Sequence, residues 1–487
     1  MIGKSINIKS LLFDNKGLKQ TIFKNTFWLA LAEAITNFSK LFLIVYVARI
    51  FGATEYGKFT FALSFVSLFA IFSDFGLGSL TIREFSKEKK DTKEFSSILS
   101  LKLVLSLIAL IVILFSSFFV TKDVEIQKVI WILAVYILSN SFLGITYAFF
   151  RARQQMEYEA FVKILQAVAV TGIGFFIIFK IPSVENLSFG YLFASLIALI
   201  FTIFLFYSKI YPLKLNFDKA TWRKFLTMSW PLGLSAILSM VYVNIDSIMM
   251  GNFNQITQVG WYNAAYKIVG ITLIPANFIS GSFFPYLSKS FEQSKEKFKK
   301  AFDYYLEIII FLSVPIVIGG IVLAPKIIDL VYDPSYFPSI FAFKLLIAIT
   351  FLSFLSGPFN QTLFILNKQK KLLLIIFLSA TTNVILNLIL IPKYSLYGAA
   401  IARVSTFLLI LILTIWFALK ISSVKLISSK MWFNFIGALA SSSLMYFVIS
   451  FPNIYKLHVA FSILIGAGVY LICFFVYKRL ADRVLTY

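Results

Sequence analysis

Long apolar runs separated by short polar segments repeat along the whole chain. A membrane-spanning helix needs about 20 mostly apolar residues, and fourteen stretches meet this requirement. The connections between them are short, so they leave no room for a soluble domain. The predicted spans cover residues 25–47, 57–80, 98–120, 128–150, 158–180, 187–208, 225–250, 259–285, 303–325, 339–366, 372–392, 397–419, 431–450 and 457–477.

Lysine and arginine are abundant in every second connection. Of the 45 such residues, 31 fall in the connections and tails on the side of the N-terminus, 8 on the opposite side and 6 within spans. Because cytoplasmic loops are enriched in positive charge, we expect both termini in the cytoplasm and a multi-pass protein of a bacterial or archaeal plasma membrane. The formal net charge of +23 then indicates basic loops against anionic membrane lipid, and no nucleic-acid partner.

The composition supports a membrane protein and argues against several kinds of chemistry. The chain has 487 residues, of which 59% are hydrophobic and 14% are charged, against about 25% charged residues in water-soluble proteins. With one cysteine (Cys473) and one histidine (His458), the chain cannot form a disulfide framework, and we expect no metal and no cofactor. The basic and apolar residues of Ile6–Phe23 predict a helix lying flat on the inner leaflet, or alternatively a disordered tail.

Two halves of the chain resemble each other. Trp28–Gly57 parallels Trp230–Gly260, and IPSVENLSFGYLFAS at 181–195 matches IPKYSLYGAAIARVS at 391–405. We therefore predict an all-α polytopic membrane fold with two six-helix bundles related by a pseudo-two-fold axis. The predicted parts are an interfacial segment (1–24), the two bundles (25–208 and 225–419), two additional transmembrane helices (431–477) and a cytoplasmic tail (478–487).

The first span carries a polar stripe. Glu33, Thr36, Asn37 and Lys40 are spaced i, i+3, i+4 and i+7, so they lie on one face of the helix. A charge inside a bilayer costs roughly 2.5–3.5 kcal/mol on insertion scales and faces protein or a wet cavity. The stripe is either the wall of such a cavity or a packing seam in which Glu33 and Lys40 pair with neighbours.

Asp246 lies near the predicted outer end of the seventh span. Lys267, in the eighth span, is at a comparable depth, and Asn263 lies one turn from it. The sequence leaves two alternatives open: Asp246 pairs with Lys267, or it contributes to a polar wall in the outer half of a cavity.

Further cations lie inside the spans. Lys40, Lys267, Lys344 and Arg403 fall in the predicted outer half, and Arg49 lies at the outer end of the first span. Because this distribution opposes the usual bias of positive charge toward the cytoplasm, it favours an anionic cargo.

Two lysines and a charged group lie near the predicted inner ends of spans. Lys102 and Lys163 are explained by snorkelling toward the membrane surface. Asp74 is followed by Arg83 and Glu84, which is consistent with an ion cluster at an inner gate or with ordinary capping of a helix end.

Other motifs are weaker. SGPFNQ at 356–361 predicts a hinge or an unwound binding segment, and Ser379, Asn383 and Asn387 predict interhelical hydrogen bonds or a cavity lining. GATEYGKF at 52–59 lacks the Ser or Thr of a phosphate-binding loop. Outer loops of about a dozen residues at most argue against an enzyme.

A resemblance emerges from NTFWLALAEAITNFSKLFLIVYVARIFGATEYGKFTFALSFVSLFAIFSDFGLGSLTIRE. This stretch resembles the polysaccharide-biosynthesis (O-antigen type) flippases, relatives of the multidrug and toxin extrusion transporters and the lipid II flippases in the multidrug/oligosaccharidyl-lipid/polysaccharide exporter superfamily. The features that match are Arg49, Gly52, Tyr56, Gly57, Asp74, Gly76 and Arg83, followed by Pro231, Asp246, Gly260, Tyr262 and Lys267.

The resemblance implies a transporter rather than an enzyme. Two bundles arranged in a V would alternate between inward-open and outward-open states and move an undecaprenyl-pyrophosphate-linked oligosaccharide (O-antigen, capsule or another exopolysaccharide unit) to the outer leaflet. A polysaccharide polymerase and a chain-length regulator are expected partners. The expected substrate residues are Asn37, Lys40, Arg49, Lys267, Lys344 and Arg403, and the expected coupling-ion or gate residues are Glu33, Asp74, Arg83 and Asp246.

Alternative functions stay open from the sequence. A drug/cation antiporter of the same superfamily should prefer an acidic cavity, whereas cations in the spans at least equal carboxylates here. A membrane polysaccharide polymerase is opposed by the short outer loops.

Overall fold

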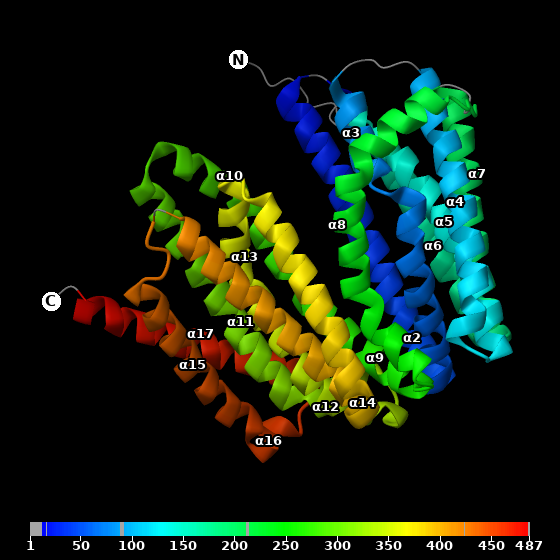
Figure 1. Cartoon of the computed structure of the whole chain (residues 1–487). Coiled ribbons are helices and arrows are strands. Elements are labelled where there is room, and N and C mark those ends of the chain that lie inside the picture. The colour runs from blue at the N-terminus through cyan, green and yellow to red at the C-terminus, as the bar shows by residue number, and fades with distance from the viewer. Residues whose placement is uncertain (1–11, 16, 88–91, 211–213, 423, 486–487) are drawn as a thin grey trace, which may run out of the picture. The chain divides into compact units, whose positions relative to one another are not determined.

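A computed structural model describes residues 12–15, 17–87, 92–210, 214–422 and 424–485 (Figure 1). Within these ranges the chain forms helices and no strands. It divides into two compact units, Met1–Asn252 and Phe253–Tyr487, and each unit is described separately. Residues 6–11 and 16 of the predicted interfacial segment at Ile6–Phe23 lie outside the described residues, so that interpretation stays a prediction.

The N-terminal unit consists of long helices that lie side by side (Figure 1). The residue ranges of these helices contain the apolar runs that were predicted as membrane spans. The elements are α2 (Leu18–Asp74), α3 (Leu77–Lys87), α4 (Thr92–Val120), α5 (Val124–Ala152), α6 (Met156–Lys180), α7 (Val184–Leu205), a π-helical turn (Phe206–Ile210) and α8 (Lys219–Asn252).

Helix α2 reverses its direction at Gly52, and no extended loop joins its two halves. Gly52 has φ 76° and ψ 174°, which are not helical. Before it, Glu33 pairs with Lys163 of α6, and after it, Lys58 pairs with Glu125 at the start of α5. The first half runs parallel to α6 and the second parallel to α5, since Leu43 contacts Gly174 and Ser73 contacts Ser141 farther along the same helices. The halves of α2 are antiparallel because α5 and α6 are, as their contacts Arg151–Glu159 and Asn140–Gln166 show.

Replacing Gly52 by alanine should destabilise the protein by about 1–3 kcal/mol. The backbone region around φ 76° and ψ 174° is essentially restricted to glycine, because a Cβ atom introduces strain there. We expect a lower midpoint of thermal unfolding for the purified variant. Gly144→Ala is the matched control, since Gly144 lies inside α5 with nothing within 4 Å of an added Cβ, and alanine favours a helix. Equal stability of the two variants would contradict the assigned reversal.

Helix α8 packs closely against the turn between α2 and α3. A Cβ atom on Gly76, which has φ +80°, would lie 2.8 Å from Cβ of Leu232, and one on Gly233 would lie 3.1 Å from the ring of Phe75. At the other end of α8, a Cβ on Gly251 would overlap the ring of Phe61. The sequence assigns span 225–250 to the second bundle, and these domain boundaries stay a prediction.

Aromatic side chains fill the core of the N-terminal unit near the start of α4. Phe95 and Phe149 have ring centroids 4.5 Å apart, and Phe206 stacks on Phe95 at 6.0 Å. All three are buried. Phenylalanine, with 56 copies in the chain, therefore packs helices together as well as covering lipid-facing surfaces.

The C-terminal unit is also entirely helical where it is described. Its elements are α9 (Ile256–Thr272), α10 (Ile274–Gln293), α11 (Lys295–Val331), a 3-10 turn (Pro334–Tyr336), α12 (Pro338–Leu346), α13 (Ala348–Ile365), α14 (Gln369–Ile421), α15 (Ser429–Ser450), α16 (Pro452–Tyr455) and α17 (Val459–Leu485).

Helix α14 reverses at Ser395 in the same way as α2 reverses at Gly52. Ser395 has φ 52° and ψ −129°, and a Cβ on Gly398 would lie 2.3 Å from the carbonyl oxygen of Leu390. Nζ of Lys371 lies 5.1 Å from the ring centre of Phe417, whereas a straight helix would place these residues roughly 70 Å apart. The two ends of α14 therefore meet.

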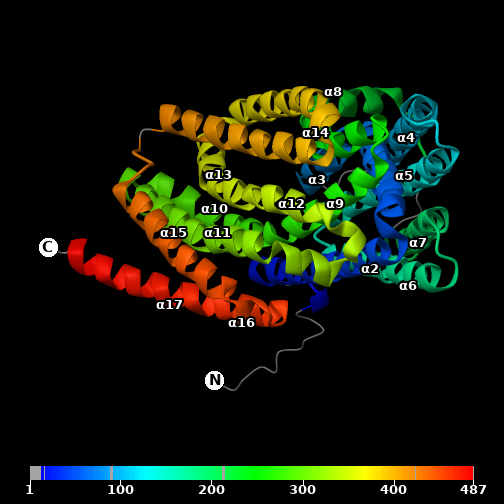
Figure 2. The ribbon, with the colours of Figure 1, turned by 90° about the horizontal axis from the view of Figure 1, so that it is seen from below.

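Helices α15 and α17, which contain the two additional predicted spans, lie side by side along α11 (Figure 2). Their contact with α11 is aromatic and apolar: the ring of Phe311 lies 4.9 Å from that of Phe474, and Tyr470 donates a hydrogen bond of 2.8 Å to the carbonyl of Phe311.

Twelve helices of the described chain are long and apolar enough to cross a membrane, judged by length and composition. Two of them contain the reversals at Gly52 and Ser395, so each of these two accounts for two predicted spans. The count therefore agrees closely with the predicted fourteen. The prediction of an all-α, multi-pass membrane protein is confirmed.

Candidate functional site

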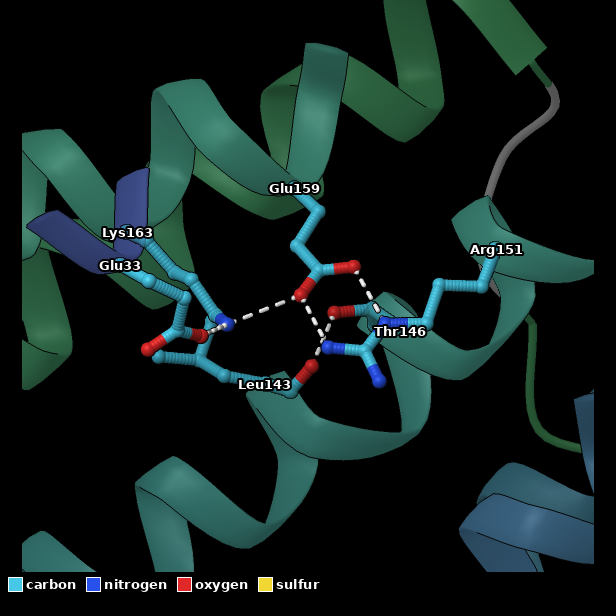
Figure 3. Close-up of polar contacts among 6 residues, drawn as sticks. All are labelled: Glu33, Leu143, Thr146, Arg151, Glu159 and Lys163. Atoms are coloured by element: carbon cyan, nitrogen blue, oxygen red, sulfur yellow. Dashed lines mark hydrogen bonds and ion pairs between the residues drawn. The ribbon is translucent and has the colours of Figure 1, made fainter. Parts of the chain in front are cut away.

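Charged side chains from three helices of the N-terminal unit meet in one cluster (Figure 3). Nζ of Lys163 lies 2.6 Å from Oε1 of Glu33 and 3.0 Å from Oε1 of Glu159. Arg151 donates two parallel hydrogen bonds, of 2.7 and 2.6 Å, to the two carboxylate oxygens of Glu159. The result is a continuous chain of charges in the order Glu33, Lys163, Glu159 and Arg151.

Local sequence places these groups. Glu159 and Lys163 are spaced i, i+4 on α6, which puts them on the same face. Glu159 lies in the first turn of α6, where a carboxylate is stabilised by the helix dipole. Its side chain is 0% exposed, and a buried carboxylate must be paired to avoid a large desolvation cost. Glu159 is therefore the centre of the cluster, whereas Glu33 is 53% exposed and terminates it.

A polar cavity of about 190 Å³ lies beside the cluster. Both Glu33 and Lys163 line it, together with Thr36 and Lys40 of the predicted stripe. Both interpretations of this stripe hold for Glu33, which pairs with Lys163 of a neighbouring helix and also lines the cavity, whereas Thr36 and Lys40 line the cavity. Asn37, the fourth member, is exposed. The other lining residues are Tyr136, Asn140, Tyr147, Gln166, Ala167, Val170, Thr171 and Tyr191.

Residues near the start of α2 donate hydrogen bonds to the connection between α5 and α6. Gln154, which has φ 59°, accepts hydrogen bonds on its carbonyl from Nζ of Lys24 (3.1 Å) and on its side chain from Nδ2 of Asn25 (2.6 Å). Lys24 is fully buried and also lies 2.8 Å from Glu157. These bonds fix the position at which α6, with its two acidic residues, begins.

Asp74 and Lys102 form a second ion pair. Nζ of Lys102 lies 2.6 Å from Oδ1 of Asp74; the lysine side chain is 0% exposed and the aspartate is 35% exposed. The sequence-based explanation of Lys102 by snorkelling was wrong, because this lysine turns into the protein toward a carboxylate. The same correction applies to Lys163.

Arg83 lies in α3 and pairs with a different carboxylate than Lys102 does. Its Nε lies 3.0 Å from Oε1 of the adjacent Glu84, and Lys87 approaches the same carboxylate at 3.6 Å. Arg83 is half exposed, and its role in a gate stays a prediction. Arg49, just before the reversal of α2, is exposed.

In the C-terminal unit, Arg403 is fully buried on α14. Its guanidinium donates a hydrogen bond of 3.0 Å to the hydroxyl of Tyr266 and lies 5.1 Å from the centre of the same ring. Stacking on an aromatic face stabilises a buried cation by about 2 kcal/mol. Arg403 is therefore part of the packing between α9 and α14.

The remaining predicted residues lie on three different helices. Lys267 lies exposed on α9, and Lys344 lies half-buried in the last turn of α12. Asp246 is buried on α8, in the N-terminal unit. The predicted pair of Asp246 with Lys267 stays a prediction, as do the roles of all these residues in transport.

SGPFNQ does not unwind. Pro358 lies inside the continuous helix α13, so the predicted unwound segment was wrong. Nε2 of Gln361 donates hydrogen bonds of 2.6 Å to the carbonyl and to the hydroxyl of Ser280 on α10. On α14, Nδ2 of Asn387 donates to Oδ1 of Asn383 at 3.3 Å. In the part of the chain that the structure describes, no three His, Cys, Asp or Glu side chains lie together as metal ligands would.

Sequence reasoning missed the second carboxylate of the cluster and its arginine. The i, i+4 spacing of Glu159 and Lys163 was the available signal, since it marks a possible ion pair on α6. The partner helices could not be read from the sequence. Glu33 and Lys163 are separated by 130 residues, and nothing in their neighbourhoods indicates that α2 and α6 are adjacent.

Known proteins share this fold or part of this sequence. The lipid II flippase MurJ in its inward closed conformation has a similar structure, with a TM-score of 0.76 and 15% sequence identity over 94% of this chain and 99% of that chain. A membrane protein of Methanocaldococcus jannaschii is 26% identical over 427 residues, 80% of this chain and 83% of the relative. The probable low-salt glycan biosynthesis flippase Agl15 of Haloferax volcanii is 23% identical over 371 residues, 75% of this chain and 76% of the relative.

The fold therefore defines a multi-pass membrane protein of the architecture found in MurJ. The family model of the polysaccharide biosynthesis proteins matches residues 22–291, which is more than half of the chain. The chain belongs to this polysaccharide biosynthesis protein family, and the resemblance found in the sequence is confirmed.

Proposed function

We propose that this protein is a flippase that moves an undecaprenyl-pyrophosphate-linked oligosaccharide from the inner to the outer leaflet of the plasma membrane by alternating access. The observation that carries the proposal is the family match over residues 22–291. Similarity to the lipid II flippase MurJ and to a glycan biosynthesis flippase supports it.

The charges inside the helices give a physical reason for this cargo. Ionisable side chains within membrane helices are costly and mark the routes of polar substrates. Lys40 lines a polar cavity in the N-terminal unit, and Lys267 is exposed on α9. In our proposal these two cations attract the pyrophosphate, with Asn37, Arg49 and Lys344 as further contacts along the route. Arg403, which is buried against Tyr266 here, would join them in a state that uncovers it.

Orientation and partners follow from the same proposal. The side of the N-terminus has 31 Lys and Arg residues and the opposite side has 8, which favours cytoplasmic termini. With this orientation, the proposed flippase moves its cargo from the cytoplasmic leaflet to the outer leaflet. Enzymes that assemble and polymerise the glycan would act before and after this step, and the protein itself would catalyse no covalent chemistry. Glu33, Asp74, Arg83 and Asp246 would couple or gate the movement.

Removing two cations should reduce flipping by at least about tenfold. A hydrogen bond to a charged group contributes about 1.5–3 kcal/mol, so loss of both ammonium groups in Lys40→Ala plus Lys267→Ala weakens pyrophosphate binding strongly. The measurement follows a fluorescent undecaprenyl-pyrophosphate sugar in proteoliposomes as it becomes accessible to an external probe.

The control variant, Lys128→Ala plus Lys180→Ala, removes the same charge from two exposed lysines near helix ends. It should flip at the wild-type rate. If the wild-type protein moves no lipid-linked sugar but exports a cationic dye, the protein is an antiporter instead.

A further inference from the structure

The polar cavity of the N-terminal unit contains unsatisfied hydrogen-bonding groups. Among the described residues, the hydroxyl oxygens of Thr36, Tyr147 and Thr171 are buried and have no hydrogen-bond partner. All three residues line the same cavity. Buried polar atoms without a partner are rare in native proteins because each costs about 1–3 kcal/mol. Three of them around one space of about 190 Å³ indicate that this space accommodates a polar ligand.

The charges around the cavity do not balance. Glu33 pairs with Lys163, and Glu159 pairs with Lys163 and Arg151. Lys40 also lines the cavity, yet across the described ranges it forms neither an ion pair nor a hydrogen bond, and Glu33 and Lys163 are the charged groups whose fields reach it. Among the charged side chains that line the cavity, Lys40 and Lys163 face the single carboxylate of Glu33, which leaves one positive charge in excess.

We propose that this cavity binds one small monovalent anion between the ammonium group of Lys40 and the hydroxyl groups of Thr36, Tyr147 and Thr171. An ammonium group offers only donors, and a hydroxyl group can turn its hydrogen toward an acceptor. Each of the four groups can therefore donate to a negatively charged ligand in the cavity that they line, and such a ligand also offsets the excess positive charge.

A cation fits this site poorly. It would lie against Lys40 and Lys163, and the single carboxylate that lines the cavity, Glu33, already accepts an ion pair at 2.6 Å from Lys163. An added positive charge would raise the excess from one to two, and like charges repel.

The size of the cavity allows two sources of the anion. At roughly 30 Å³ per water molecule, a space of about 190 Å³ holds either a halide ion with water or the carboxylate of an acidic sugar. Amide groups of Asn140 and Gln166, joined by a hydrogen bond of 2.7 Å, and the rings of Tyr136 and Tyr191 complete the wall. The shared chemistry is a single negative charge, and the two sources are separated by experiment.

Thermal unfolding of the full-length protein in lipid nanodiscs tests the proposal at constant ionic strength. Sodium chloride and sodium glucuronate are each titrated against the sodium salt of a bulky sulfonate. We expect a saturable rise of the unfolding midpoint with at least one of the two anions. Chloride alone would identify an inorganic anion as the ligand, and glucuronate alone would identify a sugar carboxylate. Anomalous diffraction from bromide would locate the halide beside Lys40.

Variants assign the binding to this cavity. Lys40→Met should raise the dissociation constant by about tenfold or more, and Thr36→Val plus Thr171→Val should raise it several-fold. Lys40→Arg should retain binding, which separates loss of charge from misfolding. Lys128→Met removes a charge from an exposed position of α5 outside the cavity lining and should bind as the wild type does.

Three results would overturn the proposal. The first is the absence of a saturable shift with either anion. The second is a shift that occurs with sodium salts but not with choline salts of the same anion, and that disappears in Glu33→Gln. Such a result would identify a cation site. The third is an equal loss in Lys40→Met and Lys128→Met. Because the measurement involves no transport, its outcome is independent of whether the protein flips lipid-linked sugars.

Discussion

Replacing Glu159 by glutamine should destabilise the protein by about 2–3 kcal/mol. Removing one partner of a buried ion pair typically costs about 3–5 kcal/mol, because the other charge is left uncompensated. Here Arg151 is 38% exposed and Lys163 is 17% exposed and keeps Glu33, so water and the remaining carboxylate reduce the loss. The midpoint of thermal unfolding in detergent measures the effect.

The control for this prediction is an ion pair of the same spacing on the protein surface. Glu296 and Lys300 are spaced i, i+4 on α11, and their side chains are 78% and 76% exposed. Glu296→Gln should leave the midpoint unchanged, since exposed pairs of this kind contribute little. If Glu159→Gln is as stable as Glu296→Gln, the charged cluster does not hold α5 and α6 together.

Asp74→Asn should cost about 3 kcal/mol. The substitution leaves the ammonium group of Lys102 buried without its carboxylate, and that side chain is 0% exposed. Replacing a buried ion pair by uncharged groups is often close to neutral, so Asp74→Asn combined with Lys102→Met should recover most of the lost stability. A double-mutant cycle then gives the coupling energy between the two residues.

The double-mutant cycle also tests the proposed role of Asp74 in gating transport. A double variant no more stable than Asp74→Asn would contradict a direct ion pair. A stable double variant that flips lipid-linked sugar at the wild-type rate would show that Asp74 is a structural residue and would remove it from the proposed gate.

The architecture was predictable because hydrophobic length is a local property. Fourteen apolar runs and the alternation of basic residues are each read within about 20 residues, and the helices follow them. The turns were not predictable in detail. The residues between the first two spans look like a loop in the sequence, but helix continues on both sides of Gly52, because this single residue provides the reversal.

The site was predictable only in part, because it depends on which helices are neighbours. The spacing of Glu33, Thr36 and Lys40 correctly indicated one face of a helix that lines a cavity. The sequence did not reveal that Lys163 would occupy the space opposite Glu33, and snorkelling offered a sufficient explanation for a lysine near the end of a span. Depth in the membrane can be estimated from position in the chain, but lateral contacts cannot.

The reversals at Gly52 and Ser395 affect how the protein fits its lipid environment. A connection that exposes polar backbone must reach water, because unpaired amide and carbonyl groups are costly in hydrocarbon. Where two helices meet through one residue, the last carbonyl groups of the first helix and the first amide groups of the second still lack helical partners. Arg49 and Lys58 flank Gly52, and Lys393 lies two residues before Ser395. Both turns therefore belong at the headgroups, and the protein adjusts to bilayers of different thickness by tilting its helices rather than by sinking these turns.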